Sequence, residues 1–425
     1  MKQRFLILII LIPIVVVGQV EQKLTLSQCY DSAISNYPNL SQLELNKAVF
    51  DLNTKNIKTN YYPKLNLNGQ ASYQSDVTKM PFGDNLPAGL QIEELDKDWY
   101  KINLDIEQMI YDGGLTSSMK KLEETDYKIS TQKLQVELYQ LKDRINHLFF
   151  NIIYLSKNEE ILSTLKNNLE VRVEDAKIAF ENGVLLSSEI DALRVEVNLT
   201  EQKIIEIDDD INALISSFNE ISGLNINTAS QLEFPDIEIS DYNFVNNRPE
   251  YLLLSLQQEK LSALKSVTAV KRKPVFMAFG QVGYGRPGYD MLKNQFDDYY
   301  KVGAALRWNI WDWSKVKREK QVLEIQSQII NSQKQTFDQN LRADLHKKIS
   351  DINKYYKLIE SDKVIVRLQE NVVKTANNQM DNGTITATNY LIEINKKAKA
   401  HLNLEAHKLQ LVYSKLLYLT AIGKI

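Results

Sequence analysis

The sequence is poor in cysteine, glycine, proline and net charge. Its one cysteine, Cys29, excludes a disulfide within the chain. The formal net charge is −3 over 425 residues, so no basic surface predicts nucleic-acid binding. The 15 glycines and 9 prolines gather at a few break points, a distribution that favours long helices between them.

Long apolar runs are also scarce. Residues 1–18 contain Lys2 and Arg4, then the apolar run from Phe5 to Val17 and the small residue Gly18. This pattern is typical of a signal peptide, and an uncleaved anchor is the alternative. After it, no stretch remains apolar over the length of about 18 residues that a membrane helix needs. We therefore predict a signal peptide over 1–18 and no transmembrane helix after it.

Catalytic motifs are missing as well. The four histidines show no spacing typical of paired metal ligands: His147, His346, His401 and His407. Neither a phosphate-binding loop nor a nucleophile elbow occurs. We predict no enzyme, no catalytic residue, no metal site and no cofactor.

What the sequence does contain is an internal duplication. Asn36-Tyr37-Pro38 matches Asn247-Arg248-Pro249, and Tyr111-Asp112 matches Trp311-Asp312. Matches over the whole length indicate two copies of one large unit rather than an array of short repeats. We predict a first repeat over 19–224, a linker over 225–246 and a second repeat over 247–425.

Each repeat contains two segments in which apolar and polar residues alternate. They cover about 64–74 and 99–110 in the first repeat, and about 275–285 and 299–310 in the second. Such runs are long enough for a tilted strand to cross a bilayer. A hairpin of a soluble, half-buried sheet is the alternative. The repetition of the hairpin and the signal peptide favour a membrane barrel.

Each repeat also contains two very long helical segments. Residues 115–182 and 314–382 hold no glycine or proline until Asn182-Gly183 and Asn382-Gly383, and about 65 helical residues extend roughly 100 Å. Apolar residues recur in steps of four and three, as in a coiled coil. They include Leu138, Leu141, Ile145 and Ile152 in the first repeat, and Leu345, Ile352, Tyr356 and Ile359 in the second. The partner helices follow turns that we place at about 180–188 and 380–388.

Four strands cannot close a barrel, and an open sheet edge is not stable in lipid. The strands of several identical chains must therefore meet around one axis. The fold class is a mixed one, in which a membrane β-barrel continues into long coiled-coil helices.

The motifs together resemble the TolC family of outer-membrane efflux proteins (outer-membrane factors). The matching signatures are Leu24-Thr25-Leu26 through Ala33, Ile110-Tyr111-Asp112-Gly113-Gly114 and the two turns at Gly183 and Gly383. The resemblance implies a homotrimer with a 12-stranded barrel in the outer membrane of a Gram-negative-type bacterium, in contact with outer-membrane lipid. It also implies a helical periplasmic tunnel, which docks by its tips onto a periplasmic adaptor (membrane fusion) protein tied to an inner-membrane transporter.

The resemblance also points to two sets of site residues. The adaptor-docking tips comprise Asn182, Gly183, Val184, Leu185, Asn382, Gly383, Thr384 and Ile385. Where some members place aspartates after the second tip, this chain has Asn389 and Ile392. A candidate acidic aperture consists of Glu189, Asp191 and Glu393 instead.

The predicted function is the exit duct of a tripartite efflux or type I secretion system, which conducts cargo passively. The alternatives are a trimeric coiled-coil stalk or adhesin and a periplasmic adaptor. The internal repeat disfavours the stalk, and the cargo stays open between drugs, metal ions and proteins.

Overall fold

The computed structural model describes residues 23–78, 95–239, 241–242, 244, 246–291 and 293–425. The predicted signal peptide lies outside the described residues. Contacts divide the chain into two compact units. We call Ser41–Val136 with Arg248–Asn340 the strand unit. The tip unit is formed by the residues up to Leu40, Glu137–Asn247 and Leu341–Ile425. Each unit thus takes residues from both predicted repeats.

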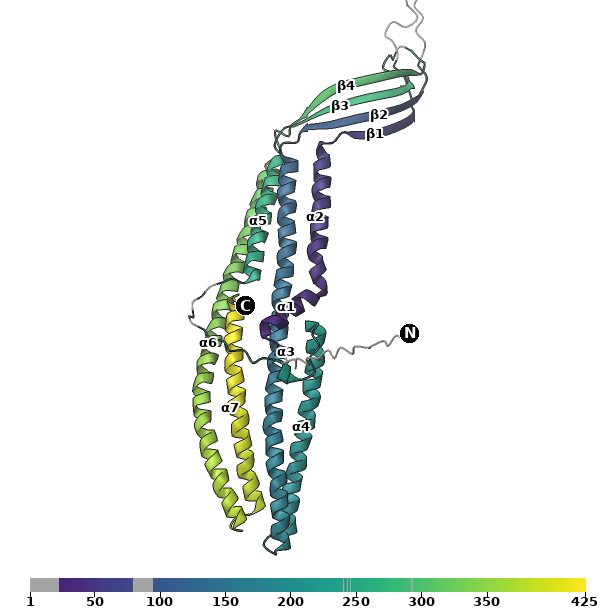
Figure 1. Cartoon of the computed structure of the whole chain (residues 1–425). Coiled ribbons are helices and arrows are strands. Elements are labelled where there is room, and N and C mark those ends of the chain that lie inside the picture. Colours follow the sequence, from purple (N-terminus) through teal and green to yellow (C-terminus); the bar gives the residue numbers. More distant parts are fainter. Residues whose placement is uncertain (1–22, 79–94, 240, 243, 245, 292) are drawn as a thin grey trace, which may run out of the picture. The chain divides into compact units, whose positions relative to one another are not determined.

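The strand unit contains an antiparallel sheet in the order β1-β2-β3-β4 (Figure 1). The strands are β1 (Lys64–Tyr73), β2 (Asp98–Tyr111), β3 (Val275–Arg286) and β4 (Asp297–Arg307). All four coincide with the alternating segments, but β4 ends at Arg307 and not at the predicted residue 310. The ladder stops there because Arg307 pairs with Val275, and the preceding Pro274 has no N–H to donate.

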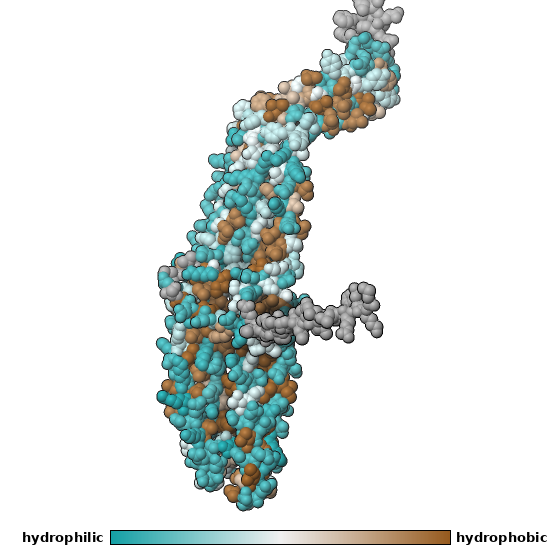
Figure 2. Space-filling view, in the orientation of Figure 1, coloured by the Kyte–Doolittle hydropathy of each residue, from teal (hydrophilic) through white to brown (hydrophobic). Residues whose placement is uncertain are grey.

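The strand register collects the apolar residues on one face of the sheet. One row across the four strands consists of Leu67, Leu104, Val282 and Tyr300. All four side chains are exposed. Figure 2 shows hydrophobic residues gathered over the sheet. A single chain therefore leaves an apolar sheet face uncovered, which marks a surface that meets lipid or another protein.

Four helices accompany the sheet in the strand unit. They are α2 (Gln42–Lys58), α5 (Pro249–Val270) and the first parts of α3 (Leu115–Glu181) and α6 (Lys315–Asp381). No helix in the part of the chain that the structure describes is both long and apolar enough to cross a membrane.

The two long helices both begin at an aspartate that follows a strand. Asp112 and Asp312 each accept a hydrogen bond from the N–H four residues ahead, at 2.6 and 3.0 Å. The two residues between each aspartate and its helix have a left-handed backbone in both copies, at Gly113-Gly114 and at Trp313-Ser314. The second copy thus holds two non-glycine residues in a conformation that costs roughly 1–2 kcal/mol each.

The tip unit contains α1 (Leu26–Asn36), α4 (Ser187–Ser222), α7 (Ala387–Ala421) and the remainders of α3 and α6. There α3 pairs with α4 and α6 pairs with α7 (Figure 1), and side chains from both pairs share an apolar core. The predicted heptad positions are buried, for example Ile145 and Ile352. Tyr356 is an exception, because it is 48% exposed and packs under the ammonium group of Lys415.

The predicted linker contributes to the core of the tip unit. Ile226 and Leu232 are buried against α1 and the middle of α3, and Leu232 forms a parallel β-bridge with Leu24. Helix α1 begins at Thr25, whose side chain forms a capping box with Gln28. The linker is thus packed together with the start of the described chain.

Candidate conduit surface and docking tips

The second face of the sheet is polar on β1 and β2 and mixed on β3, where Met277 and Phe279 share it with Gln281. Asp105 on β2 accepts hydrogen bonds from Asn68 on β1 and Gln281 on β3, both at 2.6 Å. Gln281 in turn lies opposite Lys301 on β4. Amide and charged groups therefore follow one another across all four strands. A face of this composition suits the lining of an aqueous passage, whereas the apolar face suits contact with lipid.

The two tip turns have the same geometry. Gly183 has φ +74° and Gly383 has φ +67°, the left-handed region that favours glycine. At the first tip the Gly183 N–H donates to the carbonyl of Phe180 (2.9 Å), and the next N–H donates to Ala179 (2.9 Å). The second tip repeats both bonds at 2.9 and 2.8 Å. Each long helix thus ends in a Schellman motif, which reverses the chain within a few residues.

The eight predicted tip residues divide into two groups. Asn182, Gly183, Val184 and their three counterparts in the second copy are exposed. Leu185 and Ile385 instead turn inward and pack against the shared apolar core. Val184 and its neighbour Leu186 remain 59% and 70% exposed, which is costly in water unless a partner covers them.

Arg172 on α3 connects the two tips. Its guanidinium contacts Asp381 at the end of α6 (2.9 Å) and Asp175 (3.1 Å), and it lies over the ring of Tyr390 on α7, 5.6 Å from the centroid. Burial raises the pKa of Tyr390. One side chain therefore joins three of the four helices near the turns.

Two grooves adjoin the tips. One of about 400 Å³ lies between them and is lined by residues that include Arg172, Val184 and Met380. The other, of about 500 Å³, lies between α6 and α7 and is lined by Ile385, Ile392 and Glu393 among others. Both combine apolar with charged side chains, as expected of a surface that receives a protein partner.

The candidate aperture acids do not form one cluster in the described chain. Glu189 and Asp191 lie at the start of α4, where Asp191 is 3.6 Å from Arg194. Glu393 on α7 accepts hydrogen bonds from Lys396 and Gln369, both at 2.8 Å, and these bonds lower its pKa. Within the described residues, no group of three or more His, Cys, Asp or Glu side chains is arranged to hold a metal ion. The acidic aperture stays a prediction.

Sequence reasoning missed Arg172 and the two grooves. The only local signal for Arg172 is an arginine close to an expected helix end, and its partners Asp381 and Tyr390 lie about 200 residues away in the sequence. The grooves likewise depend on how separate helices pack.

Comparisons with known proteins concern the structure. No protein-family model and no curated protein matches the sequence. The solved structure of CusC, a protein that forms a transmembrane channel, has a TM-score of 0.72 and a sequence identity of 12% with this chain. The match covers 94% of this chain and 92% of CusC. VceC, an outer-membrane protein of Vibrio cholerae, has a TM-score of 0.68 and a sequence identity of 13%, and the match covers 94% of this chain and 96% of VceC. The MtrE outer-membrane channel of Neisseria gonorrhoeae has a TM-score of 0.67 and a sequence identity of 13%, and the match covers 94% of this chain and 88% of MtrE.

These matches cover nearly the whole of each chain, strands and long helices included. At this level of identity the likeness concerns the fold. It agrees with the motifs at Asp112, Gly183 and Gly383, whose local geometry is now described. The chain has the fold of the TolC-family outer-membrane channels, as its sequence motifs predicted.

Proposed function

We propose that three copies of this chain form an outer-membrane channel that serves as the passive exit duct of a tripartite efflux or type I secretion system. The observation that carries this proposal is the four-stranded sheet, which has one exposed apolar face, one polar face and two unpaired edges. The likeness to CusC, VceC and MtrE, which are outer-membrane proteins or form channels, supports it.

The unpaired edges explain why several chains are needed. Among the residues that the structure describes, β1 and β4 each have a neighbouring strand on one side only, and backbone groups exposed in lipid cost several kcal/mol each. Because neighbouring strands run in opposite directions, β1 and β4 are themselves antiparallel. The β4 strand of one chain can therefore pair in antiparallel fashion with the β1 strand of the next. Three chains then supply twelve strands, enough for a barrel that encloses water.

The tips support docking to a periplasmic adaptor. Exposed Val184 and Leu186 adjoin charged groups on both sides of the groove at Arg172. The energy for export would come from an inner-membrane transporter to which the adaptor is attached.

The alternative functions fit the structure less well. A coiled-coil stalk needs only one membrane anchor at one end of each chain. Here two hairpins from distant parts of the sequence form one sheet. A soluble adaptor would have no use for an exposed apolar sheet face.

The mass of the particle purified in mild detergent tests the proposal. We expect three chains in each particle and extraction from membranes only with detergent. A stable monomer or dimer would refute barrel closure, because four or eight strands do not give the twelve that the proposal requires.

A further inference from the structure

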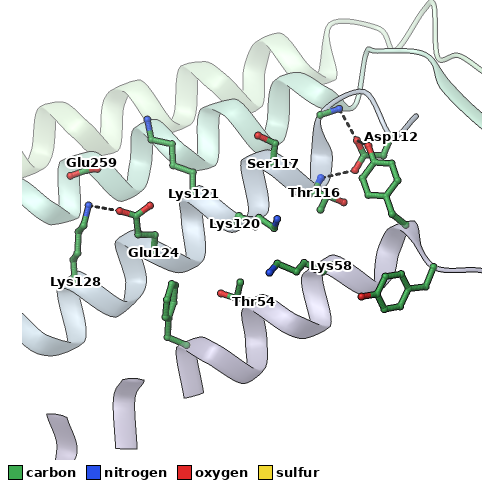
Figure 3. Close-up of a pocket in the computed structure, with 14 residues that line it drawn as sticks. Thr54, Lys58, Asp112, Thr116, Ser117, Lys120, Lys121, Glu124, Lys128 and Glu259 are labelled. Atoms are coloured by element: carbon green, nitrogen blue, oxygen red, sulfur yellow. Dashed lines mark hydrogen bonds and ion pairs between the residues drawn. The ribbon is translucent and has the colours of Figure 1, made fainter. Parts of the chain in front are cut away.

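A groove of about 1120 Å³ lies between α2 and α3, beside the ends of β1 and β2 (Figure 3). Helix α2 contributes Phe50, Thr54 and Lys58, and helix α3 contributes Ser117 and Lys120. The groove belongs entirely to the strand unit. None of these residues takes part in the polar sheet face or the docking tips.

The groove has an excess of positive charge. Four lysines line it: Lys58, Lys120, Lys121 and Lys128. Lys128 is paired with Glu124 at 2.8 Å, and the negative charge of nearby Glu259 also favours its charged form. The other three form no salt bridge with any described residue. In Figure 3, Lys58 and Lys120 extend from opposite helices toward the same space.

The remaining carboxylate of the groove is already engaged. Asp112 accepts hydrogen bonds from Tyr61 (2.8 Å) and from the N–H groups of Gly114 and Thr116. It is therefore committed to the start of α3 and does not neutralise the lysines.

Hydroxyl groups stand next to these ammonium groups. Thr54 lies one turn before Lys58 on α2, and Ser117 lies one turn before Lys120 on α3, so each pair shares a helix face. The Thr54 hydroxyl is buried and has no hydrogen-bond partner among the described residues. By contrast, Thr125 on the same stretch of α3 donates to the carbonyl of Lys121. A buried hydroxyl without a partner is rare in proteins, and a bound water or ligand is one way to satisfy it.

The groove lies where the proposed membrane surface would be. Lys58 is the last residue of α2, and Lys120 is in the second turn of α3 after β2. Aromatic residues mark this end of the sheet: Tyr62 lies between Lys58 and β1, and Trp308, Trp311 and Trp313 are exposed beyond β4. Tyrosine and tryptophan gather at the headgroup level of a bilayer.

We propose that this cationic groove, formed by Thr54, Lys58, Ser117 and Lys120, binds a phosphate group, and that a phospholipid headgroup of the periplasmic leaflet supplies it. Lys58 and Lys120 contact the phosphate oxygens, and the two hydroxyls donate hydrogen bonds to them. Because the lysines of the groove outnumber its carboxylates, an anionic phospholipid binds better than a zwitterionic one. The membrane position, although not the phosphate chemistry, rests on the proposed function.

The second repeat carries different residues at most of the corresponding positions. By the alignment of the repeats, Ala269 stands at the position of Lys58. A lysine is kept at the position of Lys120, as Lys320, whereas Lys265 pairs with Glu324 and Lys271 pairs with Glu319. The second repeat thus provides a matched control, in which the same number of charges can be removed from paired lysines.

Native mass spectrometry of the detergent-purified full chain tests the inference. The separate additions are phosphatidylglycerol, phosphatidylethanolamine and inorganic phosphate. We expect the unmodified protein to retain phosphatidylglycerol, and Lys58→Gln with Lys120→Gln to weaken that retention by roughly tenfold or more, since each of the two lost charge-assisted hydrogen bonds is worth about a factor of ten. Lys265→Gln with Lys271→Gln should bind like the unmodified protein.

Each outcome has a distinct meaning. Equal phosphatidylglycerol retention in all three proteins would overturn the inference. Binding of inorganic phosphate with no gain from the lipid would overturn the headgroup as source. The same spectra report the number of chains in the particle. A trimer that retains no lipid would refute this inference alone, whereas a monomer would refute the proposed function. Far-ultraviolet circular dichroism checks that both variants fold.

Discussion

Asp112 links strand β2 to helix α3 through its carboxylate. Burial raises its pKa, but hydrogen bonds from Thr116, Tyr61 and Gly114 outweigh burial and lower the pKa from 3.8 to about 2. A carboxyl whose pKa falls on folding stabilises the fold while it is ionised. That stabilisation is present above the ordinary pKa and is lost as the pH falls toward 2.

Replacement of this residue, Asp112→Ala, should lower the free energy of unfolding at pH 7 by about 1–2 kcal/mol, since it removes a helix cap. Thermal unfolding of the detergent-purified protein measures the difference from the unmodified chain. The difference should shrink as the pH is lowered from 4 to 2. Asp312→Ala is the control, and it should cost less because Asp312 is more exposed. An Asp112→Ala effect that stays constant over this pH range would contradict the assignment.

At the scale of elements, the strand register assigns adjacent residues to opposite surroundings. Leu67 lies in the apolar row, whereas Asn66 lies on the polar face opposite Asp105. Leu67→Arg should place a charge against lipid, cost about 2–4 kcal/mol near the middle of the membrane and impair barrel assembly. Asn66→Arg adds the same side chain on the same strand and should assemble normally. Heat-modifiable migration of the membrane fraction on gels compares the two, and equal assembly would show that the faces are wrongly assigned.

Elements defined by local patterns could be predicted from the sequence. The capping box at Thr25, the alternation that gives the strands and the glycine turns at 183 and 383 all depend on neighbours within a few residues. The end of β4 also depends on Pro274, which directly precedes β3, and the exposure of Tyr356 depends on how α6 packs in the tip unit. The packing of Leu232 against α1 and the contacts of Arg172 join distant segments, and no local pattern specifies them.

In the proposed function the whole molecule works with an adaptor protein, and the tips are the predicted contact. Gly183→Trp with Gly383→Trp should abolish cargo export and crosslinking to the adaptor. An added side chain finds space at both positions, although the left-handed backbone adds strain of roughly 1–2 kcal/mol at each. Trimer formation and membrane insertion should persist, because neither glycine packs in the apolar core.

The matched control is Gly183→Asn with Gly383→Asn, since asparagine tolerates the left-handed backbone without the bulk of tryptophan. This variant should export cargo normally. If the tryptophan variant also crosslinks and exports normally, docking lies elsewhere, for instance in the groove between α6 and α7.

The compact units of the chain cross the boundary between its repeats. The sheet needs β3 and β4 from the second half, and the tip unit is completed at its C-terminal end, where Tyr139 donates to the carbonyl of Thr420 and Ile422 is fully buried. During synthesis, neither unit can therefore be finished while the second half is still on the ribosome. A nascent first repeat would expose half a sheet and half a helical core until the second repeat has been made. If the signal peptide predicted over 1–18 directs export, we expect the chain to cross the membrane unfolded and to fold only when the last helix has arrived.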